Sequence, residues 1–438
     1  MKSSKQIILE VVLPTPVRKS FDYLPPTDWL VGSLLSPGCR VIVQFGKTTR
    51  IAMIVKIKHR SELDIQKIKH CIEIIDNKPL LDKKILKLAI WASNYYHHSL
   101  GEICFKILPI LLRNKSNYQI KQQKFWKTTT ITPAPETLSR SPKQRLCLQL
   151  LADSPLGLAD VNLKTAGIKS EQLNKLQQQG WIEAYFLQRQ AEKPSLAKAP
   201  PIKLTEEQKL VLQQCHLDSF NIHLLDGITG SGKTEIYLQL IEQKLAQSKQ
   251  VLVLVPEIGL TPQLVKRFQQ RLQIPIGLLH SGLNNQERLE NWLMTVDGQY
   301  SVLIGTRSAL FTPMKNLALI IIDEEHDPSF KQQQGWTYSA RDLALVRARD
   351  LDIPIMLGTA TPSLETLHHA MTGKYHHLKL RERPGSACTT KFQVLDIRKL
   401  PIEHGVSKPL LDNIGKHLRD GNQVIIFINR RGYAPVLM

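Results

Sequence analysis

A glycine-rich segment that ends in lysine and threonine constrains this chain more than any other feature. Residues 227–234 read Gly-Ile-Thr-Gly-Ser-Gly-Lys-Thr, the spacing of a phosphate-binding loop that joins a strand to a helix. An apolar strand at 222–225 precedes the loop, and a helix over 233–246 is predicted after it. In such a loop backbone N–H groups surround phosphate oxygens, the lysine reaches the β and γ phosphates, and the hydroxyl ligates Mg²⁺. A glycine turn that only caps a helix is the alternative. The candidate nucleotide-binding residues are Gly227, Gly230, Gly232, Lys233 and Thr234.

Two carboxylates follow a second apolar strand at 317–322. Asp323 and Glu324 come directly after this strand, at the edge where open parallel sheets bind their ligands. Asp323 is predicted to hold Mg²⁺, and Glu324 to orient and deprotonate the water that attacks the γ-phosphate. Together with Lys233, they are the expected catalytic residues of an ATP hydrolase.

Two weaker signals accompany these motifs. Gly358-Thr-Ala-Thr-Pro362 follows the next apolar strand, and its hydroxyls would sense the phosphate site and couple it to nucleic acid; an ordinary turn is the alternative. Gln208 precedes Lys233 by 25 residues, and its amide would recognise the adenine edge.

The remaining patterns predict a multidomain α/β protein. Short apolar strands alternate with helices from 204 to about 355, which indicates a doubly wound parallel sheet of the RecA-like type. Val/Ile-rich strands predict a small β-rich N-terminal domain that ends in a helix over 82–96. Three short helices before a strand at 181–187 predict a winged-helix domain. A three-helix spacer without DNA contacts is the alternative. Residues 113–135 and 191–201 are expected to be linkers. A last helix is expected over 409–419 and a last strand over 423–428. The expected domains are 1–112 (N-terminal), 113–200 (linker and winged helix), 201–390 (first motor lobe) and 391–438 (start of a second lobe).

The charge balance favours a polyanionic partner. The chain has 58 Lys and Arg against 38 Asp and Glu, a net charge of +20 over 438 residues, which is typical of nucleic-acid-binding proteins; a solvated basic face is the alternative. No apolar run approaches the ~18 residues that cross a bilayer, and the N-terminus carries no signal peptide, so a cytoplasmic protein without a membrane partner is expected. The six cysteines form no Cys-x-x-Cys pair, which leaves no zinc ligand set.

The motifs together resemble one protein family. The segments that carry the likeness are 227–237 (GITGSGKTEIY), 255–263 (VPEIGLTPQ), 280–283 (HSGL), 305–311 (GTRSALF), 323–327 (DEEHD), 358–362 (GTATP) and 429–435 (NRRGYAP). This set is similar to that of the PriA family of bacterial replication-restart helicases, and the likeness extends from Ser20-Phe-Asp-Tyr-Leu24 to the last residue.

The resemblance implies DNA contacts. In the family, a small N-terminal domain binds the 3′ end of a nascent strand, and Phe21, Asp22, Tyr23 and Gly38 match its pocket; ordinary strand residues are the alternative for the two aromatics. The aromatic-rich loop at 332–342 implies base stacking by Trp336 and Tyr338 and phosphate binding by Arg341; a buried tryptophan is the alternative. Further residues that match single-strand contacts are Thr261, Arg307 and Ser308.

The resemblance also implies a function. It predicts an ATP- and Mg²⁺-dependent helicase that moves 3′ to 5′, recognises stalled or repaired forks, and restarts replication at the nucleoid. Its expected partners are forked and single-stranded DNA, single-stranded-DNA-binding protein, primosome proteins and helicase loaders. Relatives continue past the segment 429–435 into a zinc-binding region and an arginine that reaches ATP, so we expect this chain to turn over slowly. A fork-binding primosome scaffold without unwinding activity is the alternative, and another translocase of the superfamily is a third possibility.

Overall fold

The computed structural model divides the chain into two compact units, Met1–Pro384 and Gly385–Met438. It describes residues 7–29, 35–115, 122–133, 141–154, 157–188, 203–384, 392–398, 400–403 and 406–427. The two units are described separately below. The expected domain boundaries stay a prediction.

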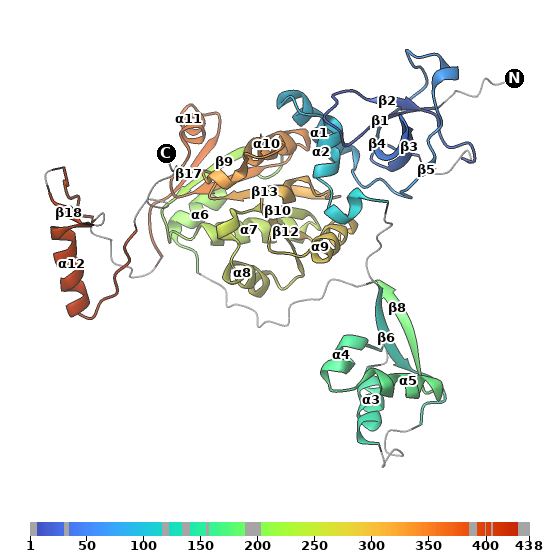
Figure 1. Cartoon of the computed structure of the whole chain (residues 1–438). Coiled ribbons are helices and arrows are strands. Elements are labelled where there is room, and N and C mark those ends of the chain that lie inside the picture. Colours follow the sequence, from blue (N-terminus) through green and yellow to red (C-terminus); the bar gives the residue numbers. More distant parts are fainter. Residues whose placement is uncertain are drawn as a thin grey trace. The chain divides into compact units, whose positions relative to one another are not determined.

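A seven-stranded parallel sheet forms the centre of residues 203–384, the lobe that is expected to bind nucleotide and is here called the nucleotide-binding lobe (Figure 1). Five of its strands are those predicted from apolar runs, and two edge strands, β11 and β17, were not predicted. The order across the sheet is β11 (Ile276–Leu279), β12 (Val302–Gly305), β10 (Gln250–Leu254), β13 (Leu317–Asp323), β16 (Ile355–Thr359), β9 (Ile222–Gly227) and β17 (His376–Leu380). The predicted RecA-like α/β lobe is confirmed.

Both faces of this sheet are covered by helices, and alternate strand residues pack into two separate cores. Leu252 lies in one core and Val253 in the other, because successive strand side chains point to opposite faces. The helices of one face are α6 (Glu206–Gln213), α7 (Lys233–Ala246) and α8 (Pro262–Leu272); those contributing to the other core include α9 (Asn285–Asp297) and α10 (Ala340–Asp350). The predicted helix 233–246 is confirmed.

The N-terminal domain is a five-stranded sheet followed by two helices. Asp82 accepts a hydrogen bond from the backbone N–H of Ile85 and so caps the predicted helix over 82–96. Gly38, with φ +94°, has no room for a side chain, since a Cβ would lie 1.9 Å from the Leu81 carbonyl oxygen. The elements are β2 (Phe21–Tyr23), β1 (Ile8–Val12), β4 (Thr48–Lys58), β3 (Arg40–Phe45) and β5 (Glu73–Ile74) in sheet order, then α1 (Lys83–Tyr95) and α2 (Leu100–Lys106).

The two N-terminal helices share a hydrophobic core with the nucleotide-binding lobe. Helix α1 packs against α10, and buried residues of both belong to one cluster. The Tyr96 hydroxyl accepts a 3.2 Å hydrogen bond from the Ser339 backbone N–H, and Lys87 pairs with Asp350 at 3.1 Å. The N-terminal domain and the lobe are therefore packed as one body.

The predicted winged helix has its three helices and a strand ribbon, but one assignment was wrong. The expected linker 113–135 contains β6 (Gln122–Thr128), which pairs along its length with β8 (Ile182–Gln188). Trp126 of this strand is buried and donates its indole N–H to Asp160. Burial of this large ring stabilises the strand although the rest of the segment is polar. The other elements are α3 (Pro142–Ala152), β7 (Leu158–Ala159), α4 (Asp160–Thr165) and α5 (Ser170–Gln178).

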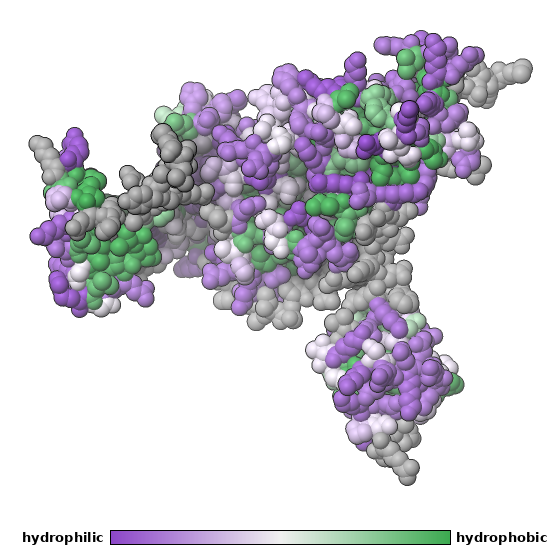
Figure 2. All heavy atoms as spheres, viewed as in Figure 1, coloured by the Kyte–Doolittle hydropathy of each residue, from purple (hydrophilic) through white to green (hydrophobic). Residues whose placement is uncertain are grey.

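The second unit contains the expected last helix, α12 (Lys408–Arg419), and a short ribbon of β18 (Ile402–Glu403) and β19 (Val406–Ser407). The prediction of a strand over 423–428 was wrong, because residues 423–427 are irregular. Ile428 lies outside the described residues. Apolar side chains of this unit gather around α12 at its surface (Figure 2), and Ile425 is 95% exposed. Among the unit's described residues, 423–427 has no partner strand, and a strand needs one for its backbone hydrogen bonds.

Within the described part of the chain, no helix combines the length and the apolar composition that crossing a membrane requires.

Candidate nucleotide and nucleic-acid sites

The phosphate-binding loop lies where the sequence predicts, between β9 and α7. Gly230 and Gly232 have φ of +82° and +88°, conformations that favour glycine. The Lys233 ammonium donates a 3.0 Å hydrogen bond to the Gly227 carbonyl and lies 3.7 Å from Oε1 of Glu324. Ser231 has a buried hydroxyl with no partner among the described residues. A lysine and an orphan hydroxyl at a helix N-terminus fit a phosphate group.

Gln208 lies directly against this loop. Its side-chain N–H donates a 3.0 Å hydrogen bond to the Ser231 carbonyl, and its oxygen accepts from the Thr205 backbone N–H. A Cβ on Gly232 would approach the Gln208 amide nitrogen to 2.4 Å. Gln208 is therefore a neighbour of the loop, while adenine recognition stays a prediction.

Asp323 faces the loop from the end of β13. Its Oδ1 accepts a 2.9 Å hydrogen bond from the Tyr237 hydroxyl, a contact that sequence reasoning missed because no residue pattern assigns this tyrosine a partner. Burial raises the pKa of Asp323, and the Tyr237 hydrogen bond opposes that rise. The next residue, Glu324, has φ +48°, a strained conformation for a side chain with Cβ and one that clusters at functional sites.

One cavity of about 490 Å³ joins these groups. Its lining includes Gln208, Lys233, Thr234, Asp323 and Glu324. The donor set fits Mg²⁺, which prefers oxygen ligands and is usually held by one or two carboxylates together with phosphates and water. Thr234 and Asp323 are the residues that would hold it.

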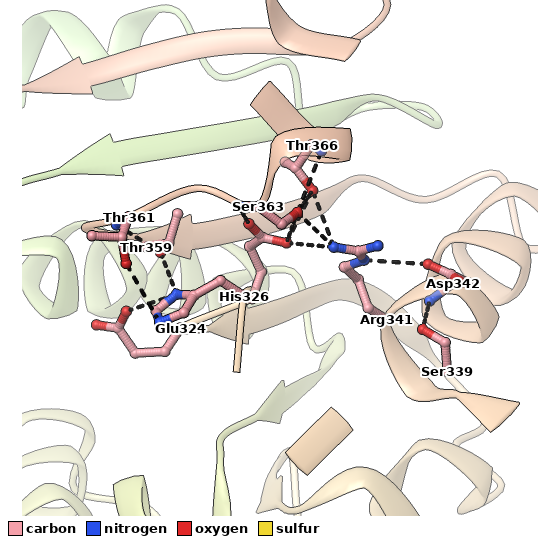
Figure 3. A network of polar contacts seen from close by, with 10 residues as sticks. Glu324, His326, Ser339, Arg341, Asp342, Thr359, Thr361, Ser363 and Thr366 are labelled. Atoms are coloured by element: carbon pink, nitrogen blue, oxygen red, sulfur yellow. Dashed lines mark hydrogen bonds and ion pairs between the residues drawn. The ribbon is translucent and has the colours of Figure 1, made fainter. Parts of the chain in front are cut away.

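A buried carboxylate network adjoins the site (Figure 3), and the sequence predicted a different role, phosphate binding, for the arginine in it. Glu325, 2% exposed, accepts hydrogen bonds from the Ser363 backbone N–H at 2.7 Å and from the Thr366 hydroxyl at 2.9 Å. Arg341 donates to the same carboxylate at 2.9 Å. The network ties the end of β13 to the starts of α10 and α11 (Leu364–Met371). The acidic run 323–325 was the only signal for it in the sequence.

His326 connects the carboxylate segment to the threonine motif. Its Nδ1 lies 2.8 Å from the Thr359 hydroxyl, and its Nε2 lies 3.4 Å from that of Thr361 (Figure 3). The imidazole also lies 3.7 Å from Glu324. His326 therefore contacts both threonine hydroxyls and lies beside Glu324, the carboxylate that is expected to activate the attacking water.

A separate cavity of about 740 Å³ opens in the N-terminal domain. Phe21, Asp22 and Tyr23 line it together with four cations and other residues. Asp22 pairs with Lys58 at 2.8 Å. Gly38 does not line this cavity. The lining cations are Lys58, Arg60, Lys67 and Lys69.

The aromatic-rich loop is folded inward. Trp336 and Tyr338 stack on each other, with ring centroids 4.3 Å apart, and both side chains are buried. This arrangement matches the alternative of a buried tryptophan, and base stacking by either ring stays a prediction that requires their exposure.

The other candidate DNA contacts are dispersed over the lobe. Arg307 donates to the Ser329 carbonyl at 2.8 Å and, with Ser308, lines a third cavity. Thr261 caps α8, accepting from the Leu264 backbone N–H. Arg341 lies in the Glu325 network rather than facing an open groove, so its phosphate contact also stays a prediction.

Two family models match the chain. Residues 10–109 match a 3′DNA-binding domain model of PriA, and residues 205–370 match the DEAD/DEAH box helicase model. The first match contains the N-terminal cavity, and the second contains the phosphate-binding loop and its carboxylates.

Relatives align along nearly the whole chain. The replication restart protein PriA of Haemophilus influenzae is 42% identical over 98% of this chain and 60% of its own length. Proteins of the same name from Chlamydia pneumoniae and Bacillus subtilis are 34% and 30% identical, over 98% and 96% of this chain and 59% and 62% of their own lengths. The chain thus spans about 60% of the length of these relatives.

Proposed function

The chain belongs to the PriA family of replication restart proteins, and from that premise we propose that it is an ATP-dependent motor that acts on DNA at replication forks. In this role the chain binds ATP, hydrolyses it with Mg²⁺, and binds single-stranded and forked DNA. It also moves from 3′ to 5′ along a strand and promotes primosome assembly and replication restart.

One observation supports the motor chemistry above all others. The loop lysine Lys233 and the strand-end carboxylates Asp323 and Glu324 line one cavity. In the proposal, Lys233 stabilises the β and γ phosphates, Thr234 and Asp323 hold Mg²⁺, and Glu324 orients the attacking water. Gln208 is the proposed adenine contact.

The proposed DNA sites are the N-terminal cavity and the lobe. Phe21, Asp22 and Tyr23 line a space with an aromatic face, a carboxylate and neighbouring cations, which suits a terminal base and its 3′ hydroxyl. The proposed partners are helicase loaders, primosome proteins and single-stranded-DNA-binding protein, at a cytoplasmic, nucleoid-associated location.

ATP turnover on forked DNA tests the proposal. We expect this chain to hydrolyse ATP faster with a fork that carries a free 3′ leading end than without DNA. Lys233→Ala should lower that rate by roughly 10²- to 10³-fold while DNA binding persists. Tight fork binding with no turnover would instead identify a primosome scaffold, and binding that ignores the 3′ end would contradict the role of the N-terminal cavity.

A further inference from the structure

A short segment after the edge strand β17 passes along the phosphate-binding loop. This segment, residues 381–384, is here called the exit segment, because the first unit ends with it. The Leu380 carbonyl at the end of β17 accepts a 3.1 Å hydrogen bond from the Ile228 backbone N–H at the start of the loop. Pro384 lines the nucleotide cavity. Part of the cavity wall therefore comes from a segment outside the phosphate-binding motif.

Glu207 on α6 holds the exit segment in place. Its two carboxylate oxygens accept hydrogen bonds from consecutive backbone N–H groups, Oε1 from Arg381 at 2.8 Å and Oε2 from Glu382 at 3.0 Å. Hydrogen bonds to a charged acceptor are roughly twice as strong as those between neutral groups. The Arg381 guanidinium also donates to Asp226 at 2.6 Å. The exit segment is therefore fixed at its first two residues.

The same turn of α6 contacts the phosphate-binding loop. Gln208, the residue after Glu207, donates a 3.0 Å hydrogen bond from its side chain to the Ser231 carbonyl. The turn is itself closed by Thr205, whose hydroxyl accepts from the Gln208 backbone N–H. One helical turn thus sets the position of the loop through Gln208 and that of the exit segment through Glu207.

Two side chains of the exit segment lie against glycines of the loop. A Cβ on Gly232 would lie 3.8 Å from Cγ of Pro384, and a Cβ on Gly230 would lie 3.9 Å from Cδ of Arg383. Arg383 is exposed and has no hydrogen-bond or ion-pair partner among the described residues. A guanidinium plane packs well on the face of an aromatic ring. These two side chains therefore offer a flat base a surface beside the loop.

We propose that Arg383 and Pro384 form the surface on which the base of a bound nucleotide stacks, and that Glu207 is the positioning residue that holds them there. The inference rests on the proposed function, because it assumes that the chain binds ATP. It complements the proposed role of Gln208, since an amide recognises the edge of a base and the exit segment covers a face. A bound base would then restrain the stretch through which the first unit continues into the second.

Competition with a fluorescent ATP analogue tests the surface, with the full chain and Mg²⁺. It gives the affinity for ATP and for inorganic triphosphate, which has no base, and the wild-type chain should bind ATP more tightly. Arg383→Lys keeps the charge but removes the planar guanidinium, so it should weaken ATP binding about fivefold and leave triphosphate binding unchanged. Arg349→Lys makes the same change at an exposed arginine outside the cavity and should change neither affinity.

Glu207→Gln tests the positioning role. Glutamine has one acceptor oxygen, so one of the two backbone N–H groups loses its partner, and ATP binding should weaken about threefold while triphosphate binding is unchanged. Glu206→Gln, at an exposed pair on the same helix, is the control. Because Glu207 acts through the exit segment, the double variant with Arg383→Lys should bind ATP more tightly than the sum of the two effects predicts.

Three results would overturn the inference. The first is wild-type ATP affinity in both Arg383→Lys and Glu207→Gln, and the second is an equal loss for ATP and triphosphate, which indicates a general change in the loop or a phosphate contact. The third is a wild-type chain that binds ATP no more tightly than triphosphate. If Arg383→Lys does not fold, Glu207→Gln decides the test. A wild-type chain that binds neither ligand would contradict the proposed function itself.

Discussion

The hydroxyl of Tyr237 donates a 2.9 Å hydrogen bond to Oδ1 of Asp323 from the helix that begins in the phosphate-binding loop. Lys233 and Tyr237 are one helical turn apart, so a single helix supplies both the lysine proposed to bind phosphate and the donor that orients Asp323, the carboxylate proposed to bind Mg²⁺. Movement of this helix would therefore shift both groups together.

Tyr237→Phe should weaken Mg²⁺ binding. The Tyr237 hydrogen bond opposes the rise in the pKa of Asp323 that burial causes, so its loss favours the protonated acid, which does not ligate a metal. We expect the Mg²⁺ concentration needed for binding of a fluorescent ATP analogue to rise about tenfold, and more at pH 6 than at pH 8. Tyr95→Phe, at an exposed position, is the control. An unchanged Mg²⁺ requirement would show that Tyr237 has no effect on Mg²⁺ binding.

Gly358→Ala should disrupt the same contact from the opposite side. A Cβ at this position would lie 1.6 Å from the Tyr237 hydroxyl oxygen, so the tyrosine or β16 must move. We expect a loss of about 1–3 kcal/mol in the free energy of unfolding, measured by urea denaturation. Adding Tyr237→Phe removes the nearest clashing atom and should recover part of the loss. Gly373→Ala tests a glycine with open space around it but positive φ, and it separates steric overlap from backbone strain.

Glu325→Gln should destabilise the lobe without touching the phosphate-binding loop. The carboxylate is buried and paired with Arg341, and removing one partner of a buried pair costs about 3–5 kcal/mol. Glu206→Gln makes the same chemical change at an exposed pair with Lys209 on α6 and should leave the unfolding midpoint unchanged. Equal effects of the two substitutions would show that the network contributes nothing beyond a surface pair.

His223 should make stability fall in mild acid. Burial, with the neighbouring His376 and His216, lowers the pKa of His223 to about 4, while an unfolded histidine has a pKa of about 6.5. Both states are neutral above about pH 6.5. Between about 6.5 and 4 only the unfolded chain gains the proton, so this group reduces stability by about 3 kcal/mol as the pH falls. His223→Gln should flatten that part of the stability curve, whereas the exposed His368→Gln should not.

The sequence predicted the parts of the fold that depend on continuous local patterns. Strand β13 is apolar along its length, and the loop before α7 has a fixed spacing, so both were located from residues alone. Strand β17, His-His-Leu-Lys-Leu, is polar because it lies at the edge of the sheet, and β11 has only four residues. Neither carries a signal that distinguishes it from a loop.

The candidate site was predictable where residues belong to motifs of known chemistry, and not where residues outside such motifs meet. Lys233 and Asp323 line one cavity, as their two motifs predict. Ser363 and Thr366 reach Glu325 across 38 and 41 residues, and only the folded sheet shows this. Similarly, the aromatic-rich segment around Trp336 predicts base stacking by this residue, but Trp336 packs against Phe311 and Tyr338 and is buried.

The shared core of α1 and α10 has a consequence for the order of synthesis. A ribosome makes α1 long before α10, and the apolar side of α1 that packs on α10 then has no cover. The β sheet before α1 forms from nearby residues, but the helix face waits for the last third of the lobe. Contacts so distant in sequence form slowly and leave apolar surface exposed meanwhile. The emerging N-terminal domain is therefore where a molecular chaperone would be needed first.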